Sequence, residues 1–373
     1  MFDDSDAGPV LPRKLSFSES EGLPTATESA PETMRAFVRI RPSSGAEAQS
    51  AIAHTENDFS IKISSLTAQQ ATETKEHCFS FDRVFPPEVG QQQVFAAAMA
   101  PQVQALLTGR DTLTFAYGIT NAGKTYTIQG GENGERGLLP RTLEAICDAL
   151  KQHKDRSADC ILDSASKYEL HASFLEVCGN DIYDLLATPE QRGGLSGMFR
   201  GSSSRRALKM KDAAGRIVIE GLKEVELPDV TAATEVMQIA WHNRQVANNG
   251  INSNSSRSHA VVCLKLLCTP PEHLTVSTTR LHLVDLAGSE RHKNTNSTGV
   301  RLNEANKINT DLFNLGRCLH DLRWNQAHPK GAQKVAPFRE SRISLLFRDY
   351  LSGLGQTVVI AAVNTRATDA AST

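Results

Sequence analysis

The chain has 373 residues, of which 40% are hydrophobic and 22% charged, as is typical of a soluble globular protein with a substantial core. No apolar run is long enough to span a membrane, and the N-terminus shows no apolar core of a signal peptide. The seven cysteines form no C-x-x-C pair, so neither a zinc site nor a disulfide framework is indicated, and we expect reduced thiols in the cytosol or nucleus.

The formal net charge of −2 is unevenly distributed along the chain. Residues 1–33 carry seven acids and two bases, a net charge of −5, which leaves +3 on residues 34–373. Because this first segment is rich in Ser, Glu, Pro and Thr and lacks apolar periodicity, it is predicted to be a disordered tail before a folded domain at 34–373. Arg13-Lys14-Leu15-Ser16 could be a kinase site, although an unmodified, solvated tail is the simpler interpretation.

The folded domain is predicted to begin with strands and a helix. Ala36, Val38 and Ile40 alternate with other side chains before Pro42, which is typical of a strand that ends at the proline. Pro101 is expected to interrupt or kink the first helix, because proline lacks a backbone N–H. The elements predicted in this part are strands at 34–42, 59–63 and 79–85 and a helix at 91–107.

The segment from Gly118 to Thr125 fits the phosphate-binding pattern G-x-x-x-x-G-K-[ST]. A β-rich run, Asp111–Tyr117, comes directly before it, so the order strand, loop, helix is the one that the pattern requires. Lys124 would then reach the β- and γ-phosphates and the Thr125 hydroxyl would bind magnesium, whereas the alternative is an ordinary glycine-containing turn before a helix. The nucleotide-binding residues predicted here are Gly118, Ile119, Thr120, Asn121, Ala122, Gly123, Lys124, Thr125 and Tyr126.

Helices and strands continue to intermingle after this loop, without an internal repeat. The segment from 191 to 211 is different, because it is rich in Gly and Ser and holds six bases and no acid. The predicted elements are helices at 138–154, 231–249, 303–325 and within 337–350, a short turn or helix at 181–186, and strands at 168–177, 216–219, 222–227, 261–267, 280–284 and 357–363. The fold class is therefore α/β, with a large mixed sheet.

Two polar segments further along the chain could complete a site for hydrolysis. In Asn252–His259 the hydroxyls, amides and guanidinium could bind magnesium, a γ-phosphate and an attacking water, although a Ser- and Asn-rich loop is by itself more often a turn. In Leu283–Glu290 an apolar strand ends at Asp285, which is the arrangement of a magnesium-binding aspartate. The amide of Gly288 could approach the γ-phosphate, because no side chain intervenes.

Together these segments resemble the kinesin motor family over about residues 34–366, nearly the whole predicted folded domain. The motifs are ordered along the chain as they are in that family, and chance matching of the full set is negligible. They are Arg39–Pro42 as the adenine-contacting strand end, Phe115-Ala116-Tyr117-Gly118 before the phosphate-binding loop, Asn252–His259 as switch I, Asp285–Glu290 as switch II, Asn306–Asn309 with Leu315-Gly316 in the relay helix, and Pro337–Ile343 as the segment that packs on tubulin.

The resemblance implies a P-loop NTPase fold of the kinesin type, with a central mixed sheet of eight strands, ATP at one edge and a microtubule on the opposite face. It also implies that Arg257 pairs with Glu290 to close the site and that Ser256 positions the attacking water. Ser255 would join Thr125 and Asp285 around magnesium. The remaining residues that the resemblance assigns are Asn252 and Gly288 in catalysis and Arg39, Arg41 and Pro42 in nucleotide binding.

Within the family, the stretches around the phosphate-binding loop and in the relay helix look like the mitotic kinesin-like proteins of cytokinesis, which suggests a role in mitosis at the spindle midzone. That branch often carries a long insertion in the motor, for which residues 149–168 are too few. Glu340 and Arg342 replace the usual Asp and Lys, and Asp311 stands where many kinesins have Lys or Ser. These differences bear on microtubule binding and on the branch, and they leave the nucleotide chemistry untouched.

A basic segment argues separately for the partner. Residues 291–349 carry eleven Lys or Arg and five acids, a net charge of +6. Such a segment is usually a solvated helical face, but an excess of this sign also suits a polyanionic partner. Nucleic acid would fit the charge, yet no stacking platform or groove-reading motif is evident, and the resemblance implies tubulin. The predicted microtubule-binding residues are Lys293, Lys307, Lys330, Lys334, Arg339 and Arg342.

The sequence therefore predicts a microtubule-stimulated ATPase of the cytoplasm and cytoskeleton, and the alternative is a nucleotide-gated microtubule binder or crosslinker that does not walk. After the strand predicted at 357–363, only a few small residues remain where the family continues with a helix and a neck linker. We expect either a motor domain truncated before those elements or one with a divergent end, and in both cases a chain that binds ATP and microtubules without moving along them. A dimer would form through regions absent from this chain.

Overall fold

The computed structural model describes residues 34–42, 52–54, 58–65, 75–131, 134–187, 205–213, 216–249, 258–271, 275–289 and 300–364. Residues 52–54, 63–65, 75–76, 247–249 and 300–309 are described for their backbone only. The tail predicted at 1–33 lies outside these residues. Within them, no helix combines the length and the apolar character that crossing a membrane requires.

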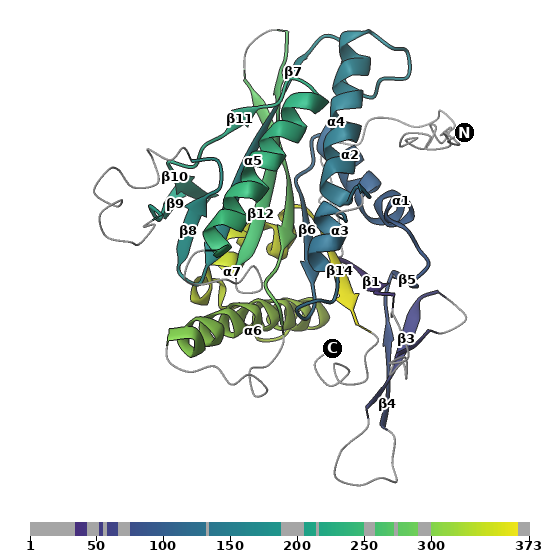
Figure 1. The fold of residues 1–373 in the computed structure, drawn as a ribbon, viewed down its shortest axis with the longest axis vertical. Helices are drawn as coiled ribbons and strands as arrows, with labels where there is room; N and C mark the ends of the chain where they lie inside the picture. Colours follow the sequence, from purple (N-terminus) through teal and green to yellow (C-terminus); the bar gives the residue numbers. More distant parts are fainter. Residues whose placement is uncertain are drawn as a thin grey trace.

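A nine-stranded mixed sheet forms the centre of the molecule (Figure 1). The five strands from β13 to β5 pair in parallel, and the strands beyond β13 pair antiparallel. Their order is β11 (Val225–Glu226), β7 (Lys167–Cys178), β12 (His259–Thr269), β13 (Ser277–Asp285), β6 (Thr112–Tyr117), β14 (Gln356–Val363), β1 (Arg35–Ile40) and β5 (Arg83–Phe85), with β8 (Asp181–Asp184) paired to β7. The predicted α/β class with a mixed sheet is confirmed, with one strand more than expected.

Both faces of the sheet are covered by helices, so its central strands are buried on both sides. Ala116 of β6 packs in the cluster under one set of helices, and its neighbour Phe115 packs in the cluster on the other face. The helices on the first face are α1 (Gln91–Val94), α2 (Ala100–Leu107), α3 (Lys124–Gln129), α4 (Leu138–Lys154) and α5 (Val230–Asn249). Those on the second face are α6 (Val300–Ala327) and α7 (Arg342–Leu346), with short helical turns at Phe338–Glu340 and Tyr350–Leu354.

Some predicted elements differ in the structure. The predicted helix at 91–107 is interrupted by a π-helical turn, Phe95–Met99, which ends two residues before Pro101. The N–H of Ala100 donates to the carbonyl of Phe95 there. The segment 181–186, predicted to be a turn or helix, instead contains β8, because a tight turn after Cys178 folds it back onto β7.

Short strands account for the other differences. The predicted strand at 79–85 is divided between β4 (Lys75–Ser80) and β5, and β4 belongs to a separate sheet with β2 (Ile52–His54) and β3 (Ser60–Ser65). The division falls at Asp82, whose carboxylate accepts a hydrogen bond from the N–H of Ala36 at 2.6 Å. The strand β9 (Lys209–Ala213), which begins in the Gly- and Ser-rich segment 191–211, was not predicted, and it forms a hairpin with β10 (Arg216–Glu220).

Candidate active site

The loop that fits the phosphate-binding pattern connects β6 to α3, in the order that the pattern requires. Gly118 and Gly123 have φ angles of 143° and 103°, which residues that carry a Cβ atom rarely adopt. A Cβ atom at Gly118 would collide with the backbone carbonyl of Ala362 in the neighbouring strand β14. Glycine is therefore required at the start of the loop by the close approach of a strand that lies far away in the sequence.

A cavity of about 770 Å³ opens beside this loop. The carboxyl end of β1 forms part of its wall with Arg39, Arg41 and Pro42, so the structure brings this strand end together with the loop, as predicted. Gly288 also lines the cavity, whereas Gly118 and Ile119 do not. The lining residues from the loop and the start of α3 are Thr120, Asn121, Ala122, Gly123, Lys124, Thr125 and Tyr126.

Lys124 is buried at the base of the loop, where its ammonium donates to the carbonyls of Gly118 and Ile119, each at 2.8 Å. The two residues that do not line the cavity therefore hold the cation in place through their backbone. Arg41 also contacts the loop, because its guanidinium donates to the carbonyl of Asn121. The cavity is thus positively charged on the side of the loop, as a site for phosphates requires.

Arg39 is part of the wall of the cavity, where its side chain is hydrogen-bonded to neighbouring residues. Its guanidinium is buried and donates to Gln91 at 2.9 Å and to Thr127 at 3.0 Å, and it packs over the ring of Tyr126 with 5.0 Å to the ring centroid. Gln91 in turn donates to the carbonyl of Tyr126 at 2.7 Å. Sequence reasoning missed Gln91, because a glutamine at the start of a helix carries no signal that it will be buried.

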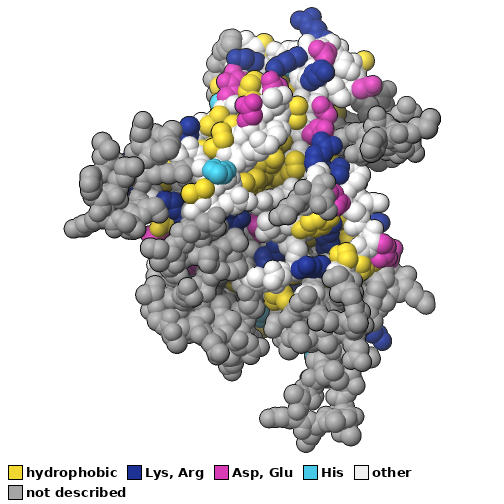
Figure 2. Space-filling view, viewed as in Figure 1, with side chains coloured by type: hydrophobic (Ala, Val, Ile, Leu, Met, Phe, Trp, Pro, Cys, Tyr) yellow, Lys and Arg dark blue, Asp and Glu magenta, His cyan; other side chains and the backbone are white. Residues whose placement is uncertain are grey.

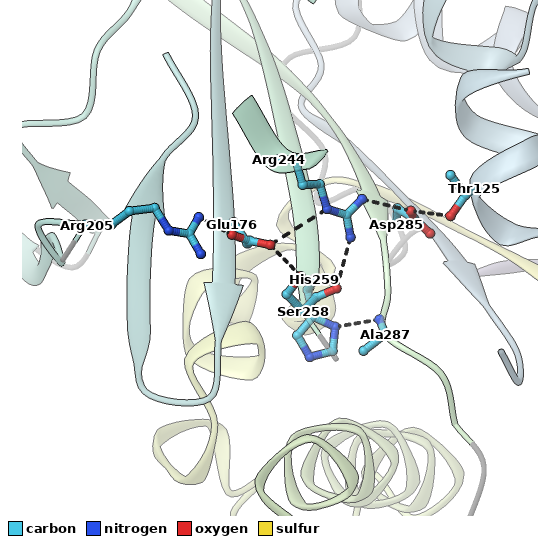
Figure 3. A network of polar contacts seen from close by, with 8 residues as sticks. All are labelled: Thr125, Glu176, Arg205, Arg244, Ser258, His259, Asp285 and Ala287. Carbon is cyan, nitrogen blue, oxygen red and sulfur yellow. Dashed lines mark hydrogen bonds and ion pairs between the residues drawn. The ribbon is translucent and has the colours of Figure 1, made fainter. Parts of the chain in front are cut away.

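The predicted metal-binding pair, Thr125 and Asp285, is in contact: the hydroxyl of Thr125 donates to Oδ2 of Asp285 at 2.8 Å (Figure 3). The pairing of β13 with β6 explains this, because Asp285 lies opposite Ala116 at the carboxyl end of both strands. A hydroxyl and a carboxylate are hard oxygen donors, and magnesium is commonly held by one or two protein oxygens together with phosphates. The residues present therefore fit magnesium.

A buried chain of charges continues from Asp285 into the sheet (Figure 3). Arg244 of α5 donates to Asp285 at 3.2 Å and to the carbonyl of Ser258 at 3.1 Å, and it lies 3.9 Å from Glu176 of β7. Glu176 also accepts from the hydroxyl of Ser258 at 2.6 Å and pairs with Arg205 on its other side. Sequence reasoning missed Arg244 and Glu176 as site residues, although a carboxylate inside an apolar strand was a usable signal for Glu176.

His259 connects β12 to the segment after β13. Its Nδ1 accepts a hydrogen bond from the N–H of Ala287 at 3.1 Å (Figure 3), so the neutral ring carries its proton on Nε2. Burial, with smaller effects of Arg244 and Lys124, lowers the pKa of His259 to about 3. The ring is therefore neutral throughout the physiological range, and protonation would break the contact with Ala287.

Because the pKa of folded His259 is lowered, we expect the free energy of unfolding to decrease as the pH falls. An unfolded histidine titrates near pH 6.5, so below that pH the unfolded chain binds a proton that folded His259 excludes. We expect His259 alone to lower the free energy of unfolding by about 2 kcal/mol between pH 7 and pH 5. Urea denaturation at several pH values measures this slope. His259→Asn should make the slope shallower without abolishing it, because burial also lowers the pKa of His282, which remains in the variant. The exposed His320→Asn is the control, and equal slopes for the unmutated chain and His259→Asn would contradict the prediction.

Several predicted site residues lie outside the residues that the structure describes. They belong to the two switch segments and to the start of the basic segment, so neither the pairing of Arg257 with Glu290 nor the position of the attacking water is addressed by the geometry. These residues are Asn252, Ser255, Ser256, Arg257, Glu290 and Lys293, together with the side chain of Lys307.

The other predicted microtubule-binding residues lie on the face of the sheet that α6 and α7 cover. Lys330, Lys334 and Arg339 are exposed, whereas Arg342 is half-buried and donates to the carbonyl of Asn180 at 3.3 Å. Lys334 packs over the ring of Trp324 with 4.3 Å to the centroid. On the face seen in Figure 2, Lys and Arg side chains lie among Asp and Glu side chains at the upper end of the molecule.

Comparisons with known proteins agree with this geometry. A family model described as "Kinesin motor domain" matches residues 39–373. The chain is 32% identical to kinesin-like protein KIF15 of Strongylocentrotus purpuratus over 89% of its length and 22% of the relative's. It is 32% identical to kinesin-like protein KIF23 of Mus musculus over 79% of its length and 37% of the relative's. The chain thus spans between 22% and 37% of the length of these two curated relatives.

Solved structures show the same similarity in three dimensions. A structure described as "kinesin 6" superposes with a TM-score of 0.71 at 26% identity, covering 91% of this chain and 96% of that one. A KIF14 dimer solved with AMP-PNP in complex with a microtubule superposes with a TM-score of 0.75 at 28% identity, covering 92% and 91% of the two chains.

Proposed function

The chain belongs to the kinesin motor family, whose motor domains are microtubule-stimulated ATPases, and from that premise we propose that it hydrolyses ATP in the cavity beside Lys124. The nucleotide state would control its binding to a microtubule and its movement along it. The single observation that carries the proposal is the contact of Thr125 with Asp285, because it joins the phosphate-binding loop to the predicted magnesium aspartate at the edge of the cavity.

Phosphoryl transfer depends mainly on positioning and on stabilising the charge of the transferred group. Lys124 supplies a buried cation at the base of the loop, and the backbone of Gly288 lines the same cavity. Thr125 and Asp285 would hold magnesium, with Ser255 as the further ligand that the family resemblance implies. When bound, the ion neutralises the negative charge that accumulates on the phosphates.

The proposed roles of the switch residues follow from the family resemblance. Arg257 and Glu290 would close the site around the γ-phosphate, and Asn252 and Ser256 would act with them on the attacking water. One described contact joins the two switch segments, because His259 at the end of the first is hydrogen-bonded to Ala287 in the second. This hydrogen bond holds the two segments together next to Leu286 and Gly288, which line the cavity.

A steady-state ATPase assay with and without microtubules tests the proposal. Strong stimulation by microtubules supports a motor ATPase. Tight nucleotide-dependent binding without stimulation would instead support the alternative, a nucleotide-gated microtubule binder or crosslinker. The similarity to KIF23 and to the "kinesin 6" structure favours a mitotic or cytokinetic role on spindle microtubules, which imaging of the tagged protein through division would examine.

Neutralising Lys330, Lys334 and Arg342 together is expected to weaken microtubule binding several-fold at low salt, and less as salt rises. Exposed charges steer a protein toward a polyanionic surface, and their effect is screened over about 10 Å at 0.1 M salt. Sedimentation with microtubules across a salt series measures the change. Neutralising the exposed bases Lys151 and Lys154, near the end of α4 on the other face, is the matched control. An unchanged affinity at low salt would place the microtubule-binding face elsewhere, and an equal loss in both variants would assign the effect to net charge alone.

A further inference from the structure

In the turn between α3 and α4, the described residues 129–131 pair with residues 135–137 beside the nucleotide cavity. Gly130 forms a β-bridge with Arg136, the N–H of Gly131 donates to the carbonyl of Glu135 at 2.8 Å, and the N–H of Gly137 donates to the carbonyl of Gln129 at 3.1 Å. A Cβ atom at Gly130 would collide with the carbonyl of Glu135, so the two sides of the turn approach as closely as glycine allows. The backbone of Glu135 is thereby held beside the cavity, which its side chain lines.

A second contact holds the side chain of Glu135. The hydroxyl of Tyr126 donates to Oε2 of Glu135 at 2.5 Å, and the Tyr126 ring is itself held under the guanidinium of Arg39. Burial and the hydrogen bond to Glu135 raise the pKa of Tyr126, so the phenol keeps its proton and remains the donor. One oxygen of the carboxylate is therefore occupied. Among the residues that the structure describes, the other oxygen has no hydrogen-bond partner, although the side chain borders the cavity.

The charges of the cavity wall bear on which half of a bound nucleotide lies near the second carboxylate oxygen of Glu135. Lys124 and Arg41 lie on the side of the loop, where phosphates are attracted. A carboxylate repels phosphates and accepts hydrogen bonds from neutral donors. A carboxylate at the wall favours an orientation with the nucleoside half toward Glu135, and this half carries such donors as ribose hydroxyls and, in adenine, an exocyclic amine.

We propose that Glu135 is a specificity-determining residue of the nucleotide site, which accepts a hydrogen bond from a neutral donor on the nucleoside half and is positioned for this by Tyr126. The inference rests on the proposed function, since it takes the cavity to bind a nucleotide. This hydrogen bond would make the site selective, because a bound nucleotide that lacks the donor would leave the second carboxylate oxygen of Glu135 without a hydrogen-bond partner. Since Glu135 is exposed, we expect a discrimination of about 10-fold rather than the larger factors of fully buried sites.

Calorimetric titration of the 373-residue chain with ADP and three analogues tests this. The 2′-deoxy and 3′-deoxy analogues each lack one hydroxyl, and inosine diphosphate replaces the amine with a carbonyl. The unmutated chain should bind ADP about 10-fold more tightly than the analogue that lacks the recognised donor, which identifies the source. Glu135→Ala should bind ADP as weakly as that analogue and should show no further loss with it, because one hydrogen bond cannot be lost twice.

Glu88→Ala is the matched control, because Glu88 is an exposed carboxylate that lines the same cavity, and any change there should be equal for all four ligands. The inference is overturned if the unmutated chain binds all four equally, or if Glu135→Ala weakens all four by one factor. Tyr126→Phe should reduce the discrimination between ADP and the analogue although Glu135 is still present. This would separate the positioning role of Tyr126 from the ligand contact made by Glu135. Absence of ADP binding by the unmutated chain would refute the proposed function itself, whereas binding without discrimination refutes only the role of Glu135.

Discussion

Replacing Lys124 with alanine is expected to lower microtubule-stimulated turnover at least about 100-fold, the loss typical of removing one group that stabilises transition-state charge. Lys124 is the buried cation of the loop, and no other lysine lines the cavity among the described residues. Steady-state ATPase measurements at saturating microtubules test the loss. Turnover near the unmutated rate would refute the placement of the phosphates beside this loop.

The control for this variant concerns the loop itself. Removing Lys124 also takes a donor away from the carbonyls of Gly118 and Ile119, so part of the effect could come from a disturbed loop. Thermal unfolding of the variant shows whether the fold survives. Thr125→Asn is a second test, because it disturbs the magnesium ligand while leaving Lys124 in place, and it too should abolish turnover.

Replacing Arg244 with alanine is expected to lower the free energy of unfolding by about 3–5 kcal/mol. The side chains of Arg244, Glu176 and Asp285 are 5%, 1% and 3% exposed, so the variant leaves two buried carboxylates without this partner. Burying an uncompensated charge is costly because neither water nor a counter-ion replaces the lost interaction. Chemical denaturation, followed by circular dichroism, measures the loss.

Arg205→Ala is the matched control for this prediction. Arg205 pairs with the same Glu176, but its side chain is 27% exposed, so water can replace part of the interaction and the loss should be smaller. The double variant Arg244→Met with Glu176→Gln should lose less than the two single changes combined, because it removes two charges of the same network. A loss for Arg244→Ala no larger than that for Arg205→Ala would show that the network contributes little to stability.

The two predictions differ in what the sequence contributed to them. Lys124 was identified from a short pattern, because the loop, its glycines and its lysine are neighbours in the chain. Arg244 had no such signal, since its partners Asp285 and Glu176 lie on two different strands and one arginine in a long helix looks like any other. Glu135 was likewise unremarkable until the turn after α3 placed it beside Tyr126 at the cavity.

Local features, by themselves, were determined by the sequence. The helix predicted at 138–154 is α4 with the same bounds, because its apolar spacing and the residues at its ends are all within one segment. The strand before the phosphate-binding loop and the fold class were determined in the same way. These features depend on interactions among residues that are close in the chain, which a sequence displays directly.

Only the tertiary structure decided the features that depend on distant pairings. Thr125 and Asp285 are 160 residues apart, and their contact exists because β13 pairs with β6 in one particular register. The strand β8 forms because β7 offers it a partner, although its own six-residue neighbourhood reads as a turn or helix. Sheet pairing and burial are set by which segments meet in space, so the buried charges around Asp285 and the position of Glu135 could not be derived from the chain alone.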